Sequence, residues 1–365
     1  MGTSPDRGFC SGPVNMQAAA HHVRAETEMI FMRKLARIGA LALLYALLLG
    51  AVLWSVLAVY YGDLPQFWRI PAAAAAGALL LGSLMLRGQR MRLTVFGLVF
   101  SLILVWWFAL EPSNTRDWQP DVAILPRAEI NGDLITLRNI RNCEYSSETR
   151  YGVNHYDKTV RLSQLKAVDL FLVYWGSPLI AHTMLSFQFG DDDFVCVSIE
   201  TRKTVDEEYS ALRGFFRQYE LIYVLGDERD LVRLRTNFRN EDVYLYRLAF
   251  NQDVACPVFL QYLKKINELY ENPQWYNALF SNCTTNIRAH ALTYTRDARI
   301  DWRILVNGFV DEMAYERGML DTRVPFADLR RLSLINARAK ALGDDPDFSL
   351  RIREGLLAPG SSNSF

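Results

Sequence analysis

The chain has 365 residues, and its 40 Lys and Arg residues are balanced by 40 Asp and Glu residues. This neutral balance gives no electrostatic reason to expect nucleic acid as a partner. Half of the residues are hydrophobic, which is high for a soluble protein, so we expect membrane segments.

Apolar residues are concentrated before residue 111, in three runs. Because about 20 apolar residues span the hydrocarbon core of a bilayer, we predict transmembrane helices at 39–61, 70–86 and 93–110. The middle run is rich in alanine and is the weakest of the three. A cleaved signal peptide is the alternative for the first run, which is long and lacks a clear small-residue cleavage site. Residues 1–32 are expected to be unstructured, with Met29 and Met32 as alternative starts.

The distribution of basic residues predicts the orientation in the membrane. They gather before the first apolar run and between the second and third, at Arg33, Lys34, Arg37, Arg87, Arg90 and Arg92. Basic loops stay in the cytoplasm, which places residues from about 111 onward in the periplasm. We therefore predict a multi-pass protein of the bacterial inner membrane, with a membrane anchor at 33–110 and a soluble domain at 111–342.

Strand-like and helix-like patterns alternate through residues 111–342 without strict βαβ order, which favours an α+β fold. Asn131 and Gly132 predict a hairpin turn, and residues 190–193 predict a second hairpin. Residues 167–176 read as a buried strand, and residues 243–250 as another. Residues 343–365 are expected to form a loose tail.

Two amphipathic helices are expected within this domain. Helical spacing occurs at four positions: Tyr209, Leu212, Phe216 and Tyr219. Pro257 is expected in the first turn of a second amphipathic helix. A further helix is predicted to begin near Cys283.

Five cysteines are candidate nucleophiles, but their contexts differ. Cys10 is predicted to be cytoplasmic. Cys143 and Cys196 lie in strand-like, apolar contexts, where they would be inert buried thiols or a disulfide. Cys256 and Cys283 are both expected at helix starts, where free N–H groups lower the pKa of a thiol and can stabilise an oxyanion. Cys283 fits a catalytic thiolate better because a tight polar turn exposes it, although a structural role stays open.

A thiol nucleophile needs a base, and the five histidines supply one strong candidate. His21 and His22 are predicted to be cytoplasmic or disordered, and His155 lies in a polar loop. His290 follows Cys283 by seven residues, about 10 Å along the same helix, which is too far for a hydrogen bond. His182 remains, at the start of a predicted strand, where a buried structural histidine is the alternative.

The hairpin around 190–193 would place Glu200 opposite His182. Glu200 is therefore expected to orient the imidazole, with Ser198 as the second choice. Arg202 is expected either to pair with Glu200 or to bind a phosphate, with a plain surface ion pair as the alternative. Asn282, together with the backbone N–H of Cys283, is a candidate oxyanion donor.

A base on a strand followed by a cysteine at a helix start is the order of circularly permuted papain-like enzymes. More closely, several segments resemble the DUF4105 family, the periplasmic domain named after the bacterial lipoprotein N-acyltransferase Lnb. The segments are "RDWQPDVAILP", "NIRNCEYSS", "AHTMLSFQF", "VSIETRKT", "YSALRGFFRQYELIYVLGDERD" and "YNALFSNCTTNI". The resemblance covers residues 114–320 and implies a permuted papain-like (NlpC/P60-like) fold with His182 and Cys283 as the catalytic pair.

The resemblance implies a membrane-anchored thiol acyltransferase. It would move an acyl chain from a phospholipid, through a thioester on Cys283, to the N-terminal amine of a lipoprotein. No metal or other cofactor is expected. Two alternatives remain: a hydrolase with the same dyad, acting on cell-wall peptides or lipids, and a non-catalytic binding protein. An apolar mouth would favour lipid, and "RGFFRQYELIY" and "WRILVNGFV" are candidates for it, unless they belong to the core.

Overall fold

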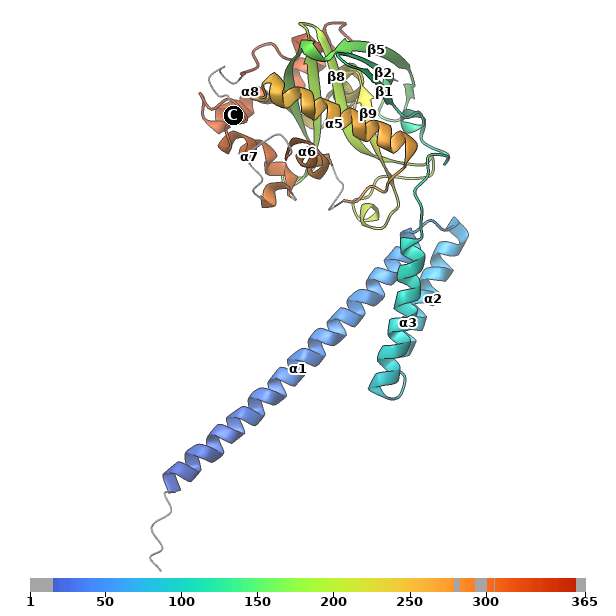
Figure 1. Cartoon of the computed structure of the whole chain (residues 1–365), viewed down its shortest axis with the longest axis vertical. Coiled ribbons are helices and arrows are strands. Elements are labelled where there is room, and N and C mark those ends of the chain that lie inside the picture. Colours follow the sequence, from blue (N-terminus) through green and yellow to red (C-terminus); the bar gives the residue numbers. More distant parts are fainter. Residues whose placement is uncertain (1–15, 279–282, 293–300, 305, 359–365) are drawn as a thin grey trace, which may run out of the picture. The chain divides into compact units, whose positions relative to one another are not determined.

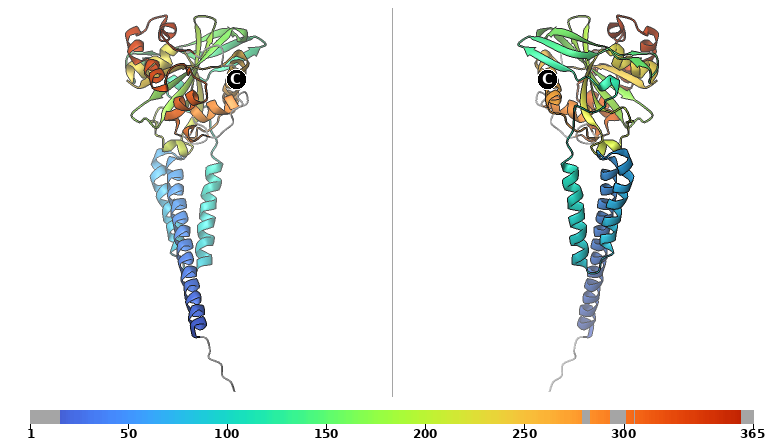
Figure 2. Two further views of the ribbon diagram at one scale, coloured as in Figure 1. Left: turned by 90° about the vertical axis from the view of Figure 1, so that its left-hand side faces the viewer. Right: turned by 90° about the vertical axis from the view of Figure 1, so that its right-hand side faces the viewer.

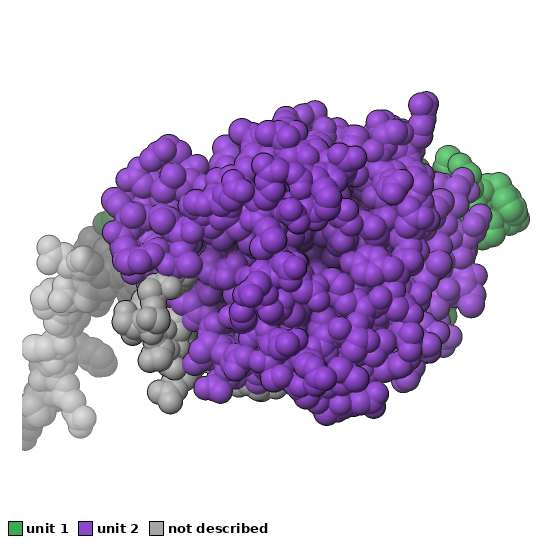
Figure 3. All heavy atoms as spheres, turned by 90° about the horizontal axis from the view of Figure 1, so that it is seen from above, with its two compact units in different colours: residues 1–60, 64–107 green, residues 61–63, 108–365 purple. Residues whose placement is uncertain are grey.

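The computed structural model describes residues 16–278, 283–292, 301–304 and 306–358. The chain divides into two compact units, residues 1–60 with 64–107 and residues 61–63 with 108–365, which Figure 3 colours separately.

The first unit consists of the helices α1 (Met16–Tyr61), α2 (Gln66–Leu84) and α3 (Gln89–Phe108). Each contains a segment long and apolar enough to cross a membrane, as predicted: Glu28–Tyr61, Gln66–Leu84 and Gln89–Phe108. Residues 16–32 belong to α1, so the expectation that they are unstructured is wrong. The alanine-rich α2 packs closely, because a Cβ at Gly77 would lie 3.0 Å from the side chain of Val56.

The second unit is built on one sheet with the strand order β1-β2-β9-β8-β7-β6-β10, and β5 pairs with β2 (Figure 1). Its strands are β1 (Arg127–Asn131), β2 (Leu134–Arg141), β5 (His155–Arg161), β6 (Leu165–Tyr174), β7 (Ala181–Phe189), β8 (Asp193–Arg202), β9 (Glu220–Gly226) and β10 (Asp242–Arg247). Neighbours are antiparallel except β2 and β9. The two short strands β3 (Glu144–Tyr145) and β4 (Tyr151–Gly152) form a separate ribbon. The predicted α+β fold is confirmed, whereas the permuted papain-like arrangement stays a prediction.

Helices cover both faces of this sheet, as the turned views of Figure 2 also show. On the α5 face, α5 (Gln252–Glu271) and α6 (Cys283–Leu292) pack on alternate strand residues such as Leu185 and Phe187. On the α4 face, the helices α4 (Glu228–Arg233), α9 (Asn336–Leu342) and α10 (Phe348–Arg351) pack on residues such as Met184. The described part of this unit also contains the helices α7 (Val310–Glu316) and α8 (Phe326–Ser333).

Both predicted hairpins are present. The first turn lies one residue later than predicted: Asn131 ends β1 and pairs with Leu134, and Gly132 and Asp133 join β1 to β2. Gly132 has a φ of 62°, a left-handed conformation that glycine adopts easily. Residues 190–192 join β7 to β8. The buried strands predicted at 167–176 and 243–250 correspond to β6 and β10.

The helical interpretation of residues 209–219 is wrong. Only a short 3₁₀ turn, Arg213–Phe215, forms there, and the chain continues as β9. Every residue of β9 is buried because this strand lies between two others, with a packed layer on each face. A strand buried on both faces carries no alternating pattern, so the apolar run of β9 gave no strand signal to mark the end of the segment before it.

The expected start of α5 is also wrong, by more than one turn. The Asn251 side chain accepts a hydrogen bond from the Val254 N–H and caps the helix, which begins at Gln252. Pro257 therefore lies inside the helix. Cys256, which precedes Pro257, is not at a helix start, so no free N–H groups of a first turn act on its thiol.

The segment after residue 343, expected to be a loose tail, is packed as far as it is described. Phe348 and Ile352 are 0% exposed in the core of the α4 face. Arg353 is buried and donates to Asp169 and Glu228. A buried arginine needs such carboxylate partners, and they fix the segment around Arg353 against the sheet.

Candidate functional site

Cys283 is the first residue of α6, as predicted, but the residue is only 7% exposed, so the expectation that a polar turn exposes it is wrong. At a helix start the first N–H groups have no partner within the helix, and they favour a negative charge. Asn282, which the sequence suggested as an oxyanion donor, lies outside the described residues.

Polar groups from three parts of the chain meet beside the Cys283 thiol. The Asn307 amide Nδ2 lies 3.9 Å from Cys283 Sγ and donates to Thr284 Oγ1 over 2.9 Å. The hydroxyl oxygens of Thr284 and Thr183 lie 3.3 Å apart. Asn307 Oδ1 accepts from the Ala181 N–H over 2.9 Å. These bonds connect the start of α6 to Ala181 and Thr183 at the start of β7, the residues immediately before and after His182.

Sequence reasoning missed Asn307, Thr284 and Thr183. Asn307 precedes Gly308, and this pair reads as an ordinary turn. Thr183 and Thr284 each follow a residue that was singled out, but nothing in the pattern showed that they meet. The one weak indication in the sequence is that each threonine directly follows a member of the predicted catalytic pair.

The His182 side chain forms a relay with Ser198 and Glu200. His182 Nε2 lies 2.8 Å from Ser198 Oγ, and Ser198 donates to Glu200 Oε1 over 2.7 Å. Met184 pairs with Ser198 in the register, which sets His182 opposite Glu200 as predicted. Both expected orienting residues are therefore present in series, with Ser198 in contact with the ring and Glu200 behind it.

This relay determines the tautomer of the ring. The single proton of Ser198 goes to the carboxylate of Glu200, so Ser198 Oγ accepts from the N–H at Nε2 of His182. The Nδ1 atom of His182 is then the nitrogen that is free to take a proton.

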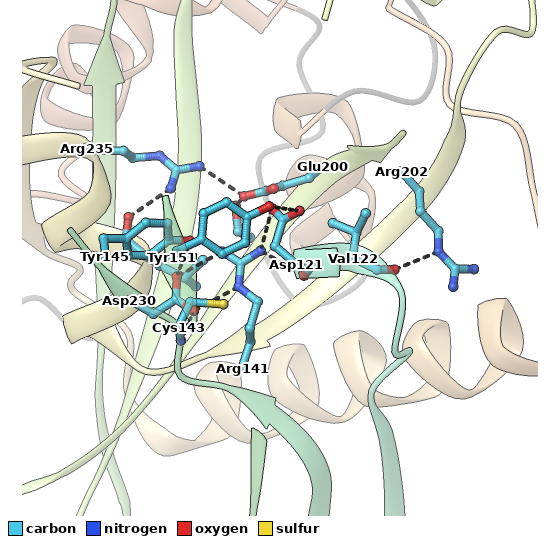
Figure 4. A network of polar contacts seen from close by, with 12 residues as sticks. Asp121, Val122, Arg141, Cys143, Tyr145, Tyr151, Glu200, Arg202, Asp230 and Arg235 are labelled. Carbon is cyan, nitrogen blue, oxygen red and sulfur yellow. Dashed lines mark hydrogen bonds and ion pairs between the residues drawn. The ribbon is translucent and has the colours of Figure 1, made fainter. Parts of the chain in front are cut away.

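Arg235 completes the relay from the α4 face (Figure 4). It lies in the π-helical turn Leu234–Phe238 and donates to Glu200 Oε1 over 3.0 Å. Burial alone would raise the pKa of Glu200, but the charges of Arg235 and Arg141 outweigh it and hold this pKa well below its usual range. Glu200 is therefore ionised and can only accept hydrogen bonds.

His182 and Cys283 project from opposite faces of the sheet. Ala181 joins the core of the α5 face, and Thr183 contacts Thr284 of α6. Because side chains alternate along a strand, His182 points to the α4 face, where it meets Ser198. The hydrogen bond predicted between His182 and Cys283 is not formed.

Burial lowers the pKa of His182 to about 3, and the nearby charge of Arg235 lowers it further in the same direction. An unperturbed thiol has a pKa of about 8.5, and each unit of mismatch costs about 1.4 kcal/mol. In this position the ring is too weak a base to ionise a thiol. The role of His182 as the base of Cys283 stays a prediction that requires the ring to move.

Arg202 does not have the predicted partner. It donates to the carbonyl oxygens of Val122 and Ala123 and to Asn114 Oδ1, and its guanidinium stacks over Trp118 at 4.2 Å. Burial lowers its pKa to about 10. Arg202 is therefore occupied with holding the segment before β1, and Arg235 takes the position beside Glu200.

The other described cysteines are poor nucleophiles. Burial, with the charge of Asp230, raises the pKa of Cys143 to about 12, and burial raises the pKa of Cys196 well above its usual value. The possible disulfide between these two is not formed, and both thiols are free. Burial also raises the pKa of Cys256.

His290 and His155 have structural partners. His290 Nε2 lies 2.9 Å from the Tyr223 hydroxyl, and its ring centroid is 4.6 Å from that of Tyr262. Burial lowers the pKa of His290 to about 4. His155 lies in β5 opposite Arg141 of β2, and burial lowers its pKa.

The fold and the site define a membrane protein in which an α+β domain, with a thiol at a helix start, follows three apolar helices. Comparison with protein families agrees with this description. Residues 152–308 match the model of the family described as the Lnb N-terminal periplasmic domain. The matched range contains His182, Ser198, Glu200, Cys283 and Asn307, and it supports the Lnb-like resemblance. Comparisons with curated proteins and with solved structures gave no match.

Proposed function

We propose that the protein is a membrane-anchored thiol acyltransferase with Cys283 as its nucleophile. It takes an acyl chain from a phospholipid and passes it to an amine, the N-terminal cysteine of a lipoprotein. The observation that carries this proposal is the position of Cys283 at the start of α6, with the Asn307 amide 3.9 Å from its sulfur. The match to an Lnb periplasmic domain supports the choice of reaction and of location.

The reaction has two balanced steps. The Cys283 thiolate attacks the ester carbonyl, and the carbonyl electron pair moves to oxygen. When this pair returns, the bond to the glycerol oxygen breaks, and the leaving alkoxide takes the proton that came from the thiol. The acceptor amine then attacks the thioester, releases the thiolate and loses a proton, which leaves an amide.

His182 is the proposed carrier of that proton, through its free Nδ1. In the position that the structure shows, the Ser198–Glu200 relay holds Nε2–H and leaves Nδ1 as the acceptor. Turning the ring toward Cys283 breaks this bond, so the relay supports the tautomer and not the active position. The proposal requires the start of β7 to turn the ring toward Cys283. Moving the ring out of its buried place beside Arg235 would also bring its pKa back toward neutrality, where a general base works best.

Exposed apolar side chains on segments that contact residues 306–309, around Asn307, support a lipid donor. Leu179 and Ile180, just before β7, are 51% and 50% exposed, and Trp302 is 60% exposed. Tyr209 is 48% exposed, and its pKa is raised by burial and then by the charge of Cys283, as for a near neighbour. Apolar groups of this kind can receive an acyl chain.

Trapping of the covalent intermediate tests the proposal. The full chain, in micelles that contain a phospholipid with a labelled acyl chain, should form a hydroxylamine-sensitive thioester on Cys283. Cys283→Ala should abolish the label, and Cys256→Ala, the matched control on α5, should retain it. A Cys283→Ala protein that still transfers the acyl group would contradict the nucleophile. Transfer to water but never to an amine would replace the transferase with a lipase.

A further inference from the structure

The Asn307 side chain is held in one orientation. It is 6% exposed, and its Oδ1 accepts from the Ala181 N–H over 2.9 Å. A backbone N–H can only donate, so the oxygen of the amide must face Ala181. Its nitrogen, Nδ2, therefore faces the start of α6.

The backbone around Asn307 fits closely against the loop before β7. The Gly308 N–H donates to the Leu179 carbonyl over 3.0 Å, and the Tyr174 hydroxyl donates to the Gly308 carbonyl over 2.7 Å. A Cβ at Gly308 would overlap the carbonyl oxygen of Pro178, so only glycine allows this approach. Asn307 is therefore positioned before any substrate arrives.

One donor of the Asn307 amide is available to the thiol. Nδ2 carries two hydrogens, and one of them is used in the 2.9 Å bond to Thr284 Oγ1. The other lies on the side of Cys283 Sγ, 3.9 Å away. That separation is long for a strong bond to sulfur, but it leaves room for an oxygen on the carbon that the sulfur attacks.

We propose that Asn307 is a catalytic residue, whose Nδ2 donates to the oxyanion that forms when Cys283 attacks an acyl carbonyl. The inference rests on the proposed function and adds the group that stabilises its transition state. A preorganised donor about 2.7–3.1 Å from the developing oxyanion typically contributes about 10²–10³ in rate. The N–H groups at the start of α6 provide the other donors.

Two reactions of Cys283 separate this role from a structural one. Acylation by a phospholipid develops an oxyanion, whereas alkylation by iodoacetamide displaces iodide and develops none at the attacked carbon. Asn307→Leu should slow single-turnover acylation by about 10²–10³-fold. Its alkylation rate, measured on the high-pH plateau where the thiol is fully ionised, should stay close to that of the parent protein.

Two further variants keep the test decisive. Asn307→Asp retains an acceptor for Ala181 but loses the donors, so it should show the same selective loss. Asn267→Leu is the matched control, because Asn267 also bonds the backbone of one strand residue, Ala128, in both directions. It should show no selective loss of acylation. Equal loss of both reactions in both Asn307 variants, or unchanged acylation, would overturn the role of Asn307. Persistent thioester formation in Cys283→Ala would instead reject the proposed function.

Discussion

His182 donates through Nε2 to Ser198 on the face of the sheet opposite to Cys283, with 2.8 Å between the two heavy atoms. The bond keeps Nδ1 free and basic in principle, while burial beside Arg235 keeps the whole ring neutral. Orientation and activation of this histidine are therefore separate properties in this structure. The Ser198–Glu200 relay orients the ring without making it a strong base. Catalysis and stability therefore give separate predictions for these residues.

The first prediction concerns the base. His182→Gln should slow thioester formation on Cys283 by about two to four orders of magnitude, the usual contribution of a positioned base. His290→Gln is the matched control, because His290 is also largely buried with a lowered pKa but lies on α6 against Tyr223. Single-turnover acylation of both variants measures the difference. A slow His290→Gln beside a normal His182→Gln would transfer the role to His290.

The second prediction concerns stability against pH. In the folded state the pKa of His182 is about 3, below its usual value of 6.5. Below pH 6.5 His182 is protonated in the unfolded chain but stays neutral in the folded chain. The free energy of unfolding therefore falls as the pH drops from about 6.5 toward 3. The loss is at most about 1.4 kcal/mol per pH unit for one histidine. His182→Gln should flatten this dependence, as followed by thermal unfolding at several pH values. An unchanged slope would mean that the ring is not buried.

The third prediction concerns the ion pair behind the relay. Arg235→Met leaves Glu200 buried without its strongest partner, which typically costs about 3–5 kcal/mol. The double variant Arg235→Met/Glu200→Gln removes the unpaired charge and should recover part of that loss. Denaturation of the parent, the two single variants and the double variant measures the coupling. Additive losses would show that the two side chains do not interact in solution.

Much of this arrangement could be predicted from local patterns. The turn at 190–192 sets the register of β7 and β8, and Glu200 lies opposite His182 for that reason. The start of α6 at Cys283 also agrees with the sequence. Charge and hydropathy located the three apolar helices. Each of these features depends on residues close together in the chain.

The features that sequence reasoning missed depend on distant residues. Arg235 reaches Glu200 from a helix 35 residues later, and Asn307 reaches Thr284 and Ala181 from two other segments. The face on which His182 projects follows from the whole sheet and its two helical layers. A hairpin register sets the neighbour of a residue but not which helix covers each face.

The fourth prediction concerns orientation. Because basic residues gather before the first apolar helix and between the second and third, residues after Phe108 should face the periplasm. Alkaline phosphatase fused after Trp118 should be active, and the same reporter fused after Arg87 should be inactive. β-Galactosidase fusions at the two sites should give the reverse pattern. An active β-galactosidase after Trp118 would place the domain in the cytoplasm and contradict the periplasmic assignment.

The last prediction concerns the chain end. Removal of residues 344–365 deletes Phe348, which is fully buried, and takes Arg353 from Asp169 and Glu228. Loss of one buried phenylalanine costs about 3–5 kcal/mol, and the carboxylate of Glu228 is left without this arginine inside the protein. The unfolding temperature should therefore fall strongly, or the domain should fail to accumulate.

Removal of residues 359–365 alone keeps Phe348 and Arg353 and is the matched control, so it should leave the unfolding temperature close to that of the parent. The single change Arg353→Met keeps the apolar contacts and should give an intermediate loss. Equal stability of the long deletion and the control would mean that the segment after residue 343 is a loose tail after all.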